Sequence, residues 1–352
     1  MRSRSSKSKL RWLFAGVLAP LVFIGLAGCG TTLTKFETDA PLPSDLPPDL
    51  QDRFQVKDEV TLGVATPRLQ DLAKAEPRSK KRGKKGKKGQ KDQDAKTEAP
   101  KPNAFDGKYP MRRPEKDPTW VGETMDYDIT WLGVSAARFR LEVLPHKVVN
   151  GRKVYHVRGT AKSTGVFSLV YRIHDYGESY IDYDGIYSHR LHVNQDESRQ
   201  NRDMLELYDS EKGQSFFWSR WSRPNIPFEE KKEFFGMPPF PQDSMSALFF
   251  MRTQPLPDGG VIKFPVISEG QTWDGSLTVV RREELKAPWG EKVKVVVIKP
   301  EAQFQGQARR GGDSYIFVTD DERRVPIRVE IKAKIGAITA HLTEWNKGQA
   351  PQ

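Results

Sequence analysis

The sequence predicts a mostly β protein in which a large curved antiparallel sheet, or an open barrel-like meander, wraps around one central helix. Three observations lead to this prediction. After residue 109, apolar and polar residues alternate with a period of two, turn-forming residues separate the alternating runs, and one short helical segment is apolar on nearly all sides. We divide the 352 residues into a signal peptide at 1–28, a flexible Pro-rich and Lys-rich linker at 29–103, and a single β-rich domain at 104–347.

The first 28 residues have the layout of a secretory signal peptide. Basic residues without an acidic one precede an apolar run of about fifteen residues, shorter than the roughly 20 that span a bilayer. The segment Leu26–Cys29 resembles the lipobox of bacterial lipoproteins. That resemblance implies that Cys29, the only cysteine of the chain, becomes the first mature residue and carries a covalent lipid. The alternative is an N-terminal membrane anchor with an incidental cysteine.

The residues after Cys29 bear on the membrane in which the protein resides. In some bacteria an aspartate directly after the lipidated cysteine favours the inner membrane, whereas this chain has Gly30 and Thr31. We therefore expect a protein anchored by lipid in the outer membrane and facing the periplasm. Three acyl chains, as the resemblance implies, would anchor it stably where a single chain would not.

The segment 29–103 lacks the composition of a folded domain. It is rich in Pro, Lys, Asp and Gln and poor in aromatic residues, so it buries too little apolar surface to offset the entropy of ordering. Only the stretch from Phe54 to Leu72 has the pattern of a helical turn or docking segment. Residues 78–91 contain nine Lys or Arg and no acid, and they account for most of the net charge of +11.

We interpret the basic run 78–91 as a solvated spacer. The alternative is contact with an anionic envelope polymer or with lipid headgroups. Nucleic acid is not expected as a partner, because an exported chain would rarely meet it.

Strands joined into hairpins are predicted along the rest of the chain. The strand pattern is clearest at residues 138–143 and 327–332, where apolar side chains fall on one strand face and charged ones on the other. Turn residues such as Asn150–Gly151 separate these runs. A repeated strand–turn–strand spacing favours two meander halves, at 120–221 and 260–346. The alternative is that any two β-hairpins look alike at this level.

One helix is predicted between the halves, over residues 243–253. Asp243 or Ser244 can cap its free amide groups, and prolines bound it at both ends. Because apolar residues cover nearly its whole circumference, this helix belongs inside the fold.

The sequence contains no recognisable catalytic motif, so we expect a non-enzymatic protein without a metal site or any cofactor beyond the lipid on Cys29. His174 and Asp175 could act as a base and its orienting group, but neighbours on a strand face opposite sides. Only a cluster of these two with Glu178 in a deep cleft would favour a hydrolase. The acidic residues 320–322 are typical of a solvated hairpin turn.

Aromatic residues are more numerous than hairpin stacking requires. Most are expected in the core, but some could line an apolar cavity for a small ligand. The residues predicted to line such a cavity are Trp131, Phe167, Tyr171, Phe249 and Phe250.

Four segments in order, 122–143, 163–182, 243–253 and 319–330, resemble the bacterial domain-of-unknown-function family 3108 (DUF3108), and the likeness extends over about residues 109–346. The resemblance implies an envelope protein and supplies no catalytic or binding residue. We therefore expect a lipoprotein that binds a lipophilic or envelope component in the periplasm. The alternative is a structural or adaptor module that contacts envelope proteins or polymer without a small ligand.

Overall fold

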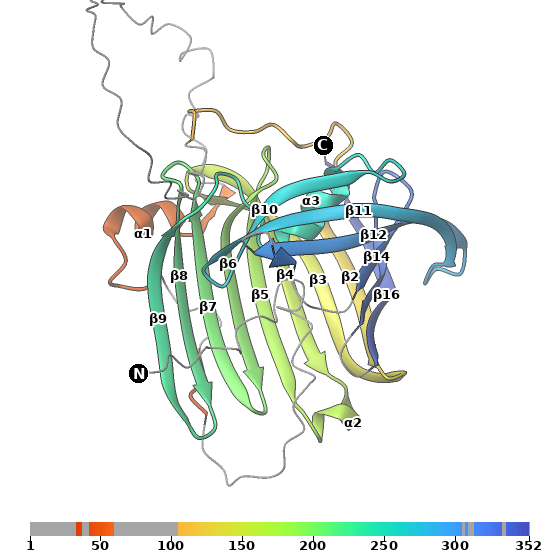
Figure 1. Cartoon of the computed structure of the whole chain (residues 1–352), viewed down its shortest axis with the longest axis horizontal. Coiled ribbons are helices and arrows are strands. Elements are labelled where there is room, and N and C mark those ends of the chain that lie inside the picture. The colour runs from red at the N-terminus through yellow and green to blue at the C-terminus, as the bar shows by residue number, and fades with distance from the viewer. Residues whose placement is uncertain are drawn as a thin grey trace, which may run out of the picture.

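The computed structural model describes residues 33–36, 42–59, 105–304, 307–308, 313–332 and 336–351. The predictions for Cys29, for the signal peptide and for the basic run 78–91 lie outside these residues. Within them, the predicted mostly β architecture is confirmed: one large, open, antiparallel sheet of 16 strands dominates the structure, with three short helices (Figure 1).

Fourteen strands form one continuous path through the sheet, and two further short strands are attached to it. In spatial order the path runs through β10 (Val261–Ser268), β11 (Gln271–Lys286), β12 (Lys292–Phe304), β14 (Ser314–Thr319), β15 (Pro326–Lys332), β16 (Ala337–Gln349), β2 (Val121–Trp131), β3 (Val134–Val149), β4 (Arg152–Ser163), β5 (Ile173–Asp182), β6 (Ser188–Glu197), β7 (Gln200–Asp209), β8 (Gln214–Arg223) and β9 (Ile226–Gly236). The attached strands are β1 (Lys57–Asp58), which pairs with β3, and β13 (Gln307–Ala308), which pairs with β12.

Local sequence patterns account for these hairpins. In β2 the side chains of Met125, Tyr127 and Ile129 are buried, and the residues between them are partly exposed. Asn150 and Gly151 have positive φ angles of 54° and 68° and form the tight turn between β3 and β4. Both predicted strand segments, 138–143 in β3 and 327–332 in β15, are confirmed.

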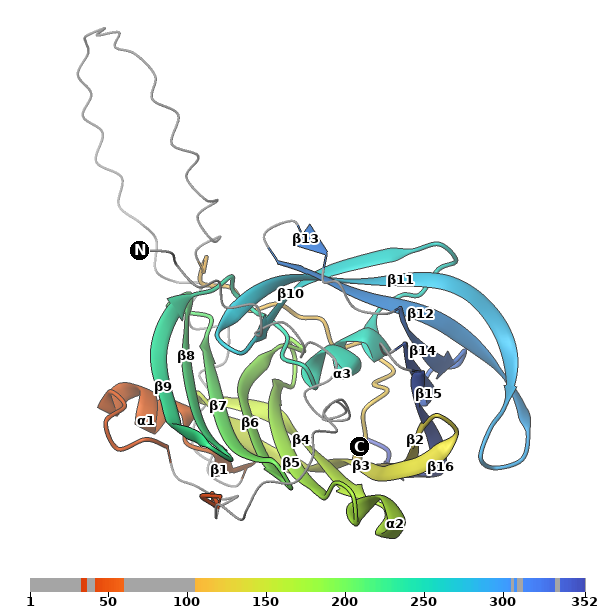
Figure 2. The same cartoon turned by 60° about the horizontal axis from the view of Figure 1, so that its bottom comes forward.

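The two predicted meander halves form a single sheet, because β16 of the second half pairs with β2 of the first. The sheet curves strongly, so that β10–β12 lie opposite β4–β9 (Figure 2). The turn between β10 and β11 reaches β7: the amide of Gly270 donates to Glu206 Oε1 at 2.7 Å, and Arg202 pairs with Glu269 at 2.6 Å. Side chains thereby connect two distant parts of the sheet.

The predicted helix is confirmed as α3 (Ser246–Thr253). Asp243 caps it, because its Oδ1 accepts hydrogen bonds from the amides of Met245 and Ser246, both at 2.6 Å. The helix packs on both sides: Met245 contacts Gly177 of β5, and the Phe250 ring lies 5.1 Å from that of Phe264 in β10. Figure 2 shows α3 between these two parts of the sheet. We name the face of β2–β9 that contacts α3 the inner face, and the opposite one the outer face.

A segment of the predicted linker packs on the outer face. Residues 42–59 form the helix α1 (Pro48–Phe54) and strand β1. Leu46, Leu50 and Phe54 are buried in a second apolar cluster against residues such as Leu205 and Trp218. The prediction of a flexible linker is therefore wrong for residues 42–59, since these three side chains and the partly buried Leu42, at a spacing of four, compensate for the Pro-rich composition. A further short helix, α2 (Gly165–Ser168), lies between β4 and β5.

Residues 33–36 also contact the outer face. The amide of Thr34 donates to Ser222 Oγ at 3.1 Å, and Asn201 Nδ2 donates to the carbonyl of Thr34 at 2.9 Å. The guanidinium of Arg220 lies 4.7 Å from the ring centre of Phe36. The chain is thus held against β7 and β8 only a few residues after Cys29.

Replacing Phe36 by Ala should lower the free energy of unfolding by about 1–2 kcal/mol, because the ring loses its packing and its cation–π contact. Urea denaturation of the mature chain measures this effect. The neighbouring exposed residue supplies the control, since Lys35→Ala should change the stability by less than about 0.5 kcal/mol. Equal midpoints for Phe36→Ala and the wild type would mean that this segment does not stabilise the fold.

Candidate functional site

The inner face changes from apolar to polar across the sheet. Cross-strand register places Tyr127, Phe139 and Ala161 in one row with Asp175 and its neighbours on β6–β8. On β6, β7 and β8 this row continues with Gln195, Arg202 and Trp221. The row lies next to the one that contains Gly177, which contacts Met245 of α3. Apolar and polar groups therefore line the same inner surface beside the helix.

A buried polar cluster marks the polar side of this face. Its members are Tyr171, Asp175, Gln195, Glu197 and Gln200, which we name the inner polar cluster. Glu197 Oε2 accepts hydrogen bonds from Tyr171 Oη at 2.5 Å and from Gln200 Nε2 at 2.8 Å. Gln195 Nε2 lies 3.4 Å from Asp175 Oδ2. The remaining oxygens, Asp175 Oδ1 and Glu197 Oε1, are buried and accept no hydrogen bond from an amide, hydroxyl or basic donor in the described part of the chain, but the two carboxyl groups can share a hydrogen bond when one of them is protonated.

The two carboxyl groups of this cluster influence each other. Burial and the neighbouring Glu197 carboxylate raise the pKa of Asp175 well above its usual range. Burial also raises the pKa of Glu197, although hydrogen bonds from Tyr171 and Gln200 act in the opposite direction. A pair of this kind favours holding a proton and can both donate and accept hydrogen bonds. It is suited to bind the polar end of a ligand.

The outer face has a different polar arrangement. Glu178 accepts from His156 at 2.8 Å and from Arg158 at 2.9 Å, and Asp203 is held in the same way by His192 and Arg220. Burial opposes ionisation of Glu178, but the charge and hydrogen bond of His156 together with hydrogen bonds from Tyr176 and Arg158 outweigh it, so its pKa lies far below the usual range. These carboxylates are saturated with partners, and the N-terminal segment lies over the same face.

The structure separates some of the predicted site residues. Trp131 is at the end of β2, and Phe167 and Tyr171 lie in or just after α2, near the same end of the sheet. Phe249 and Phe250 are instead buried in the core on α3. Of the five, Tyr171 contacts the inner polar cluster directly. Sequence reasoning missed Gln195 and Glu197, whose signal was their spacing of two from the apolar Leu191 and Val193, which puts all four on one face of β6.

The residues considered for hydrolysis do not form a cluster. His174 is exposed, and Asp175 faces inward on the adjacent position. Glu178 lies on the outer face with His156. In the acidic segment 320–322, Asp321 accepts hydrogen bonds from its own turn, including the amide of Arg323 at 3.0 Å. Among the described residues, no group of three His, Cys, Asp or Glu side chains is arranged to hold a metal ion.

A surface pocket of about 410 Å³ lies between α1 and the turn joining β3 and β4. Its basic side chains are already paired: Arg53 bonds to Asp209 at 2.8 Å, and Lys57 bonds to Asp52 at 2.9 Å. The pocket therefore offers little free charge to a ligand, and the inner polar cluster is the stronger candidate.

No helix in the described part of the chain has the length and apolar character needed to cross a membrane.

The described residues thus define a protein built on one open, curved antiparallel sheet with a buried polar cluster on its inner face. The chain belongs to the family described as protein of unknown function (DUF3108), whose model matches residues 126–343. The family predicted from the four sequence segments is therefore confirmed. None of the curated proteins matches the chain.

Three solved structures are similar to the chain at low identity. A β-barrel-like protein of domain of unknown function DUF1849 from Brucella abortus has 9% identity and a TM-score of 0.43, covering 64% of this chain and 98% of its own. A predicted lipoprotein from Parabacteroides distasonis has 10% identity and a TM-score of 0.24, covering 68% and 97%. A predicted exported protein with a YmcC-like fold from Bacteroides fragilis has 10% identity and a TM-score of 0.25, covering 65% and 97%.

Proposed function

We propose that this protein is an outer-membrane lipoprotein, attached through a lipid on Cys29, that binds an amphiphilic component of the envelope in the periplasm without chemically changing it. In this proposal the curved sheet wraps around α3, and the ligand lies on the inner face beside the helix. The lipobox-like segment at Leu26–Cys29 supports the attachment. The inner face supports the binding.

One observation carries the binding proposal. A single row of cross-strand neighbours runs from Tyr127, Phe139 and Ala161 to Asp175 and Arg202. An amphiphile matches such a row, because its apolar part gains from contact with the first three and its headgroup can bond to the polar end. The two carboxyl oxygens without donors, on Asp175 and Glu197, are the natural partners of a headgroup that donates hydrogen bonds.

Native mass spectrometry tests whether the protein binds a ligand. The chain is purified from the periplasm as the Cys29→Ser variant, which lacks the lipid anchor. We expect a lipid-like molecule to be retained by the wild-type sheet. The double variant Asp175→Asn with Glu197→Gln keeps the shape but replaces the acidic oxygens, and its occupancy should fall about tenfold, the effect of one lost hydrogen bond to a charged group.

Asp196→Asn is the matched control. Asp196 lies between Gln195 and Glu197 on β6 but pairs with Arg172 on the outer face at 2.7 Å. Its variant should retain the ligand. A folded wild-type chain that carries no small molecule would contradict the binding proposal and favour an adaptor that contacts envelope proteins or polymer.

A further inference from the structure

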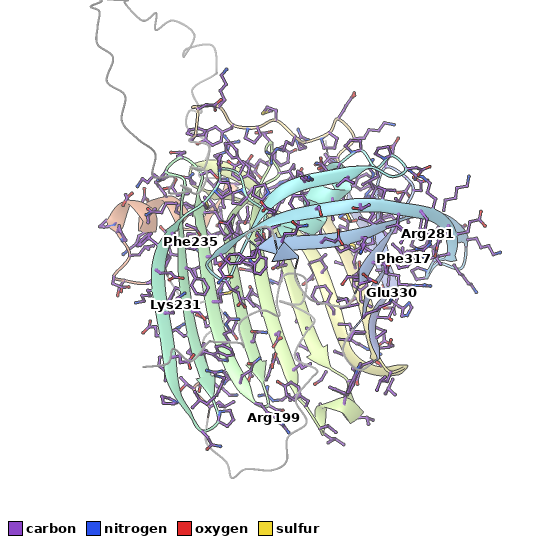
Figure 3. All side chains as sticks on the ribbon, viewed as in Figure 1. Arg199, Lys231, Phe235, Arg281, Phe317 and Glu330 are labelled. Carbon is purple, nitrogen blue, oxygen red and sulfur yellow. The ribbon has the colours of Figure 1, made fainter. Side chains whose placement is uncertain are left out.

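One end of the sheet gathers four turns. The connections β2–β3, β4–β5, β6–β7 and β8–β9 all lie there, at the lower edge in Figure 1, and Arg199 marks the β6–β7 turn in Figure 3. Hydrogen bonds join neighbouring turns: Thr164 bonds to the carbonyl of Ser135 at 2.9 Å, and the amide of Ser198 bonds to the carbonyl of Arg172 at 3.0 Å. We name this edge the turn-bearing end.

Exposed apolar side chains collect at the turn-bearing end. Of the twelve large apolar residues that stand out as exposed in the described part of the chain, seven belong to it. They are Leu132, Val134, Val166, Leu169, Val170, Ile226 and Phe228. Leu169 is 87% exposed and Val166 is 81% exposed. Single exposed apolar residues are normal, but a group at one edge marks a surface for an apolar partner.

The start of the folded chain lies at the same end. Thr34 bonds to Ser222 near the end of β8 and to Asn201 near the start of β7, whereas Phe36 lies farther along the sheet near Arg220. The chain therefore runs from the turn-bearing end onto the outer face. Four peptide steps separate Cys29 from Leu33, so these two Cα atoms lie within about 14 Å of each other.

Basic side chains surround the apolar ones. Near the four turns the basic residues are Lys35, Arg138, Lys162, Arg172, Arg199 and Arg223, and the acidic residues are Asp128, Asp196, Glu197 and Glu229. Asp196 pairs with Arg172, and Glu229 pairs with Arg223. The excess of basic groups suits a surface that carries negative charge, such as a leaflet with anionic headgroups.

From these observations we propose that the turn-bearing end docks on the lipid bilayer that holds the acyl chains of Cys29. Val166, Leu169 and Val170 enter the interface between headgroups and acyl chains, and the basic residues contact the headgroups. This inference rests on the proposed lipoprotein, because the short tether from Cys29 selects a bilayer as the occupant. It fixes the orientation of the sheet, with the turns toward the membrane and the β3–β4 turn away from it.

A fluorescent label tests this orientation. Because Cys29 is the only native cysteine and is acylated in the proposed protein, a cysteine introduced by Leu169→Cys is the only free thiol. The acylated full chain is reconstituted in vesicles of phosphatidylethanolamine and phosphatidylglycerol. A polarity-sensitive dye on residue 169 should shift to the blue and be quenched by nitroxides attached to the lipid acyl chains.

The matched control places the label at the opposite end. Glu115 is exposed and lies two residues after Arg113, whose amide bonds to the carbonyl of Asp184 in the β5–β6 connection. A label at Glu115→Cys should stay in water. Quenching at both sites, or at neither, would overturn the proposed orientation.

A second measurement separates this inference from the lipoprotein proposal. The non-acylated Cys29→Ser chain should still bind the same vesicles, and Leu169→Ser with Val170→Ser should weaken that binding about tenfold. The two sites are exposed, so the fold should be unaffected. Absence of a lipid on the mature wild-type chain would refute only the lipoprotein. Unchanged vesicle binding by the double variant would refute the docking surface, as would a dimer in solution that the same two substitutions dissociate.

Discussion

Replacing Arg252 by Met should lower the free energy of unfolding by about 3–5 kcal/mol. Arg252 lies on α3, and its side chain and that of Glu123 on β2 are both fully buried. The guanidinium bonds to both oxygens of Glu123 at 2.9 Å and to the carbonyl of Pro118 at 2.7 Å. Its removal leaves a buried carboxylate with fewer partners, which is the costly part of breaking such a pair.

Thermal and urea denaturation of the mature chain measure this loss. Arg140→Met is the control, because Arg140 pairs with Asp126 at 2.7 Å but is 51% exposed, and exposed pairs contribute at most about 1 kcal/mol. Glu123 also bonds to Arg323 and to Trp345 Nε1, so Arg323 and Trp345 limit the damage. A loss for Arg252→Met no larger than that for Arg140→Met would contradict the assignment of this pair as the link between α3 and the sheet.

Glu206→Gln should change the dependence of stability on pH. Glu206 is fully buried, and burial raises its pKa from 4.5 to about 7 although Tyr208 Oη donates a hydrogen bond to it. In the folded protein Glu206 therefore keeps a proton at pH values where the same carboxyl in the unfolded chain has released it. Through this group, the free energy of unfolding falls as pH rises from 4.5 to about 7, by on the order of 3 kcal/mol.

The Gln variant lacks this titration, so its stability relative to the wild type should increase across the same pH range. Urea denaturation at a series of pH values measures the difference, in which other buried acids such as Asp243 cancel. Ser215→Ala on β8 is a control, because Ser215 is also buried but does not titrate. Its curve should run parallel to that of the wild type. A Glu206→Gln curve that is also parallel would refute the raised pKa.

The sequence predicts much of this fold because the residues that determine each hairpin are close together in the chain. Alternation in β3 and β15 and the Asn150–Gly151 turn need no distant information. The cap of α3 is equally local, since Asp243 precedes the helix it caps. These elements depend on residues only a few positions apart, so a single sequence is enough to predict them.

Other features depend on distant segments and were not predicted. Residues 42–59 have a linker-like composition, yet Leu42, Leu46, Leu50 and Phe54 recur every fourth residue, and their partners on β7 and β8 come much later in the chain. The inner polar cluster joins residues from the β4–β5 connection through β7, so only strand register brings them together.

The contact between the β10–β11 turn and β7 has a mechanical consequence. In the described residues, β9 and β10 are the two ends of the strand path and share no ladder of backbone hydrogen bonds. Arg202 with Glu269 and Glu206 with Gly270 close this seam instead. Two backbone hydrogen bonds, Gln242 amide to Pro265 carbonyl and Ile267 amide to Gln242 carbonyl, also hold β10 to the segment that follows β9. Ionisation of Glu206 therefore changes one of the polar contacts between the two ends of the strand path, the hydrogen bond from the Gly270 amide.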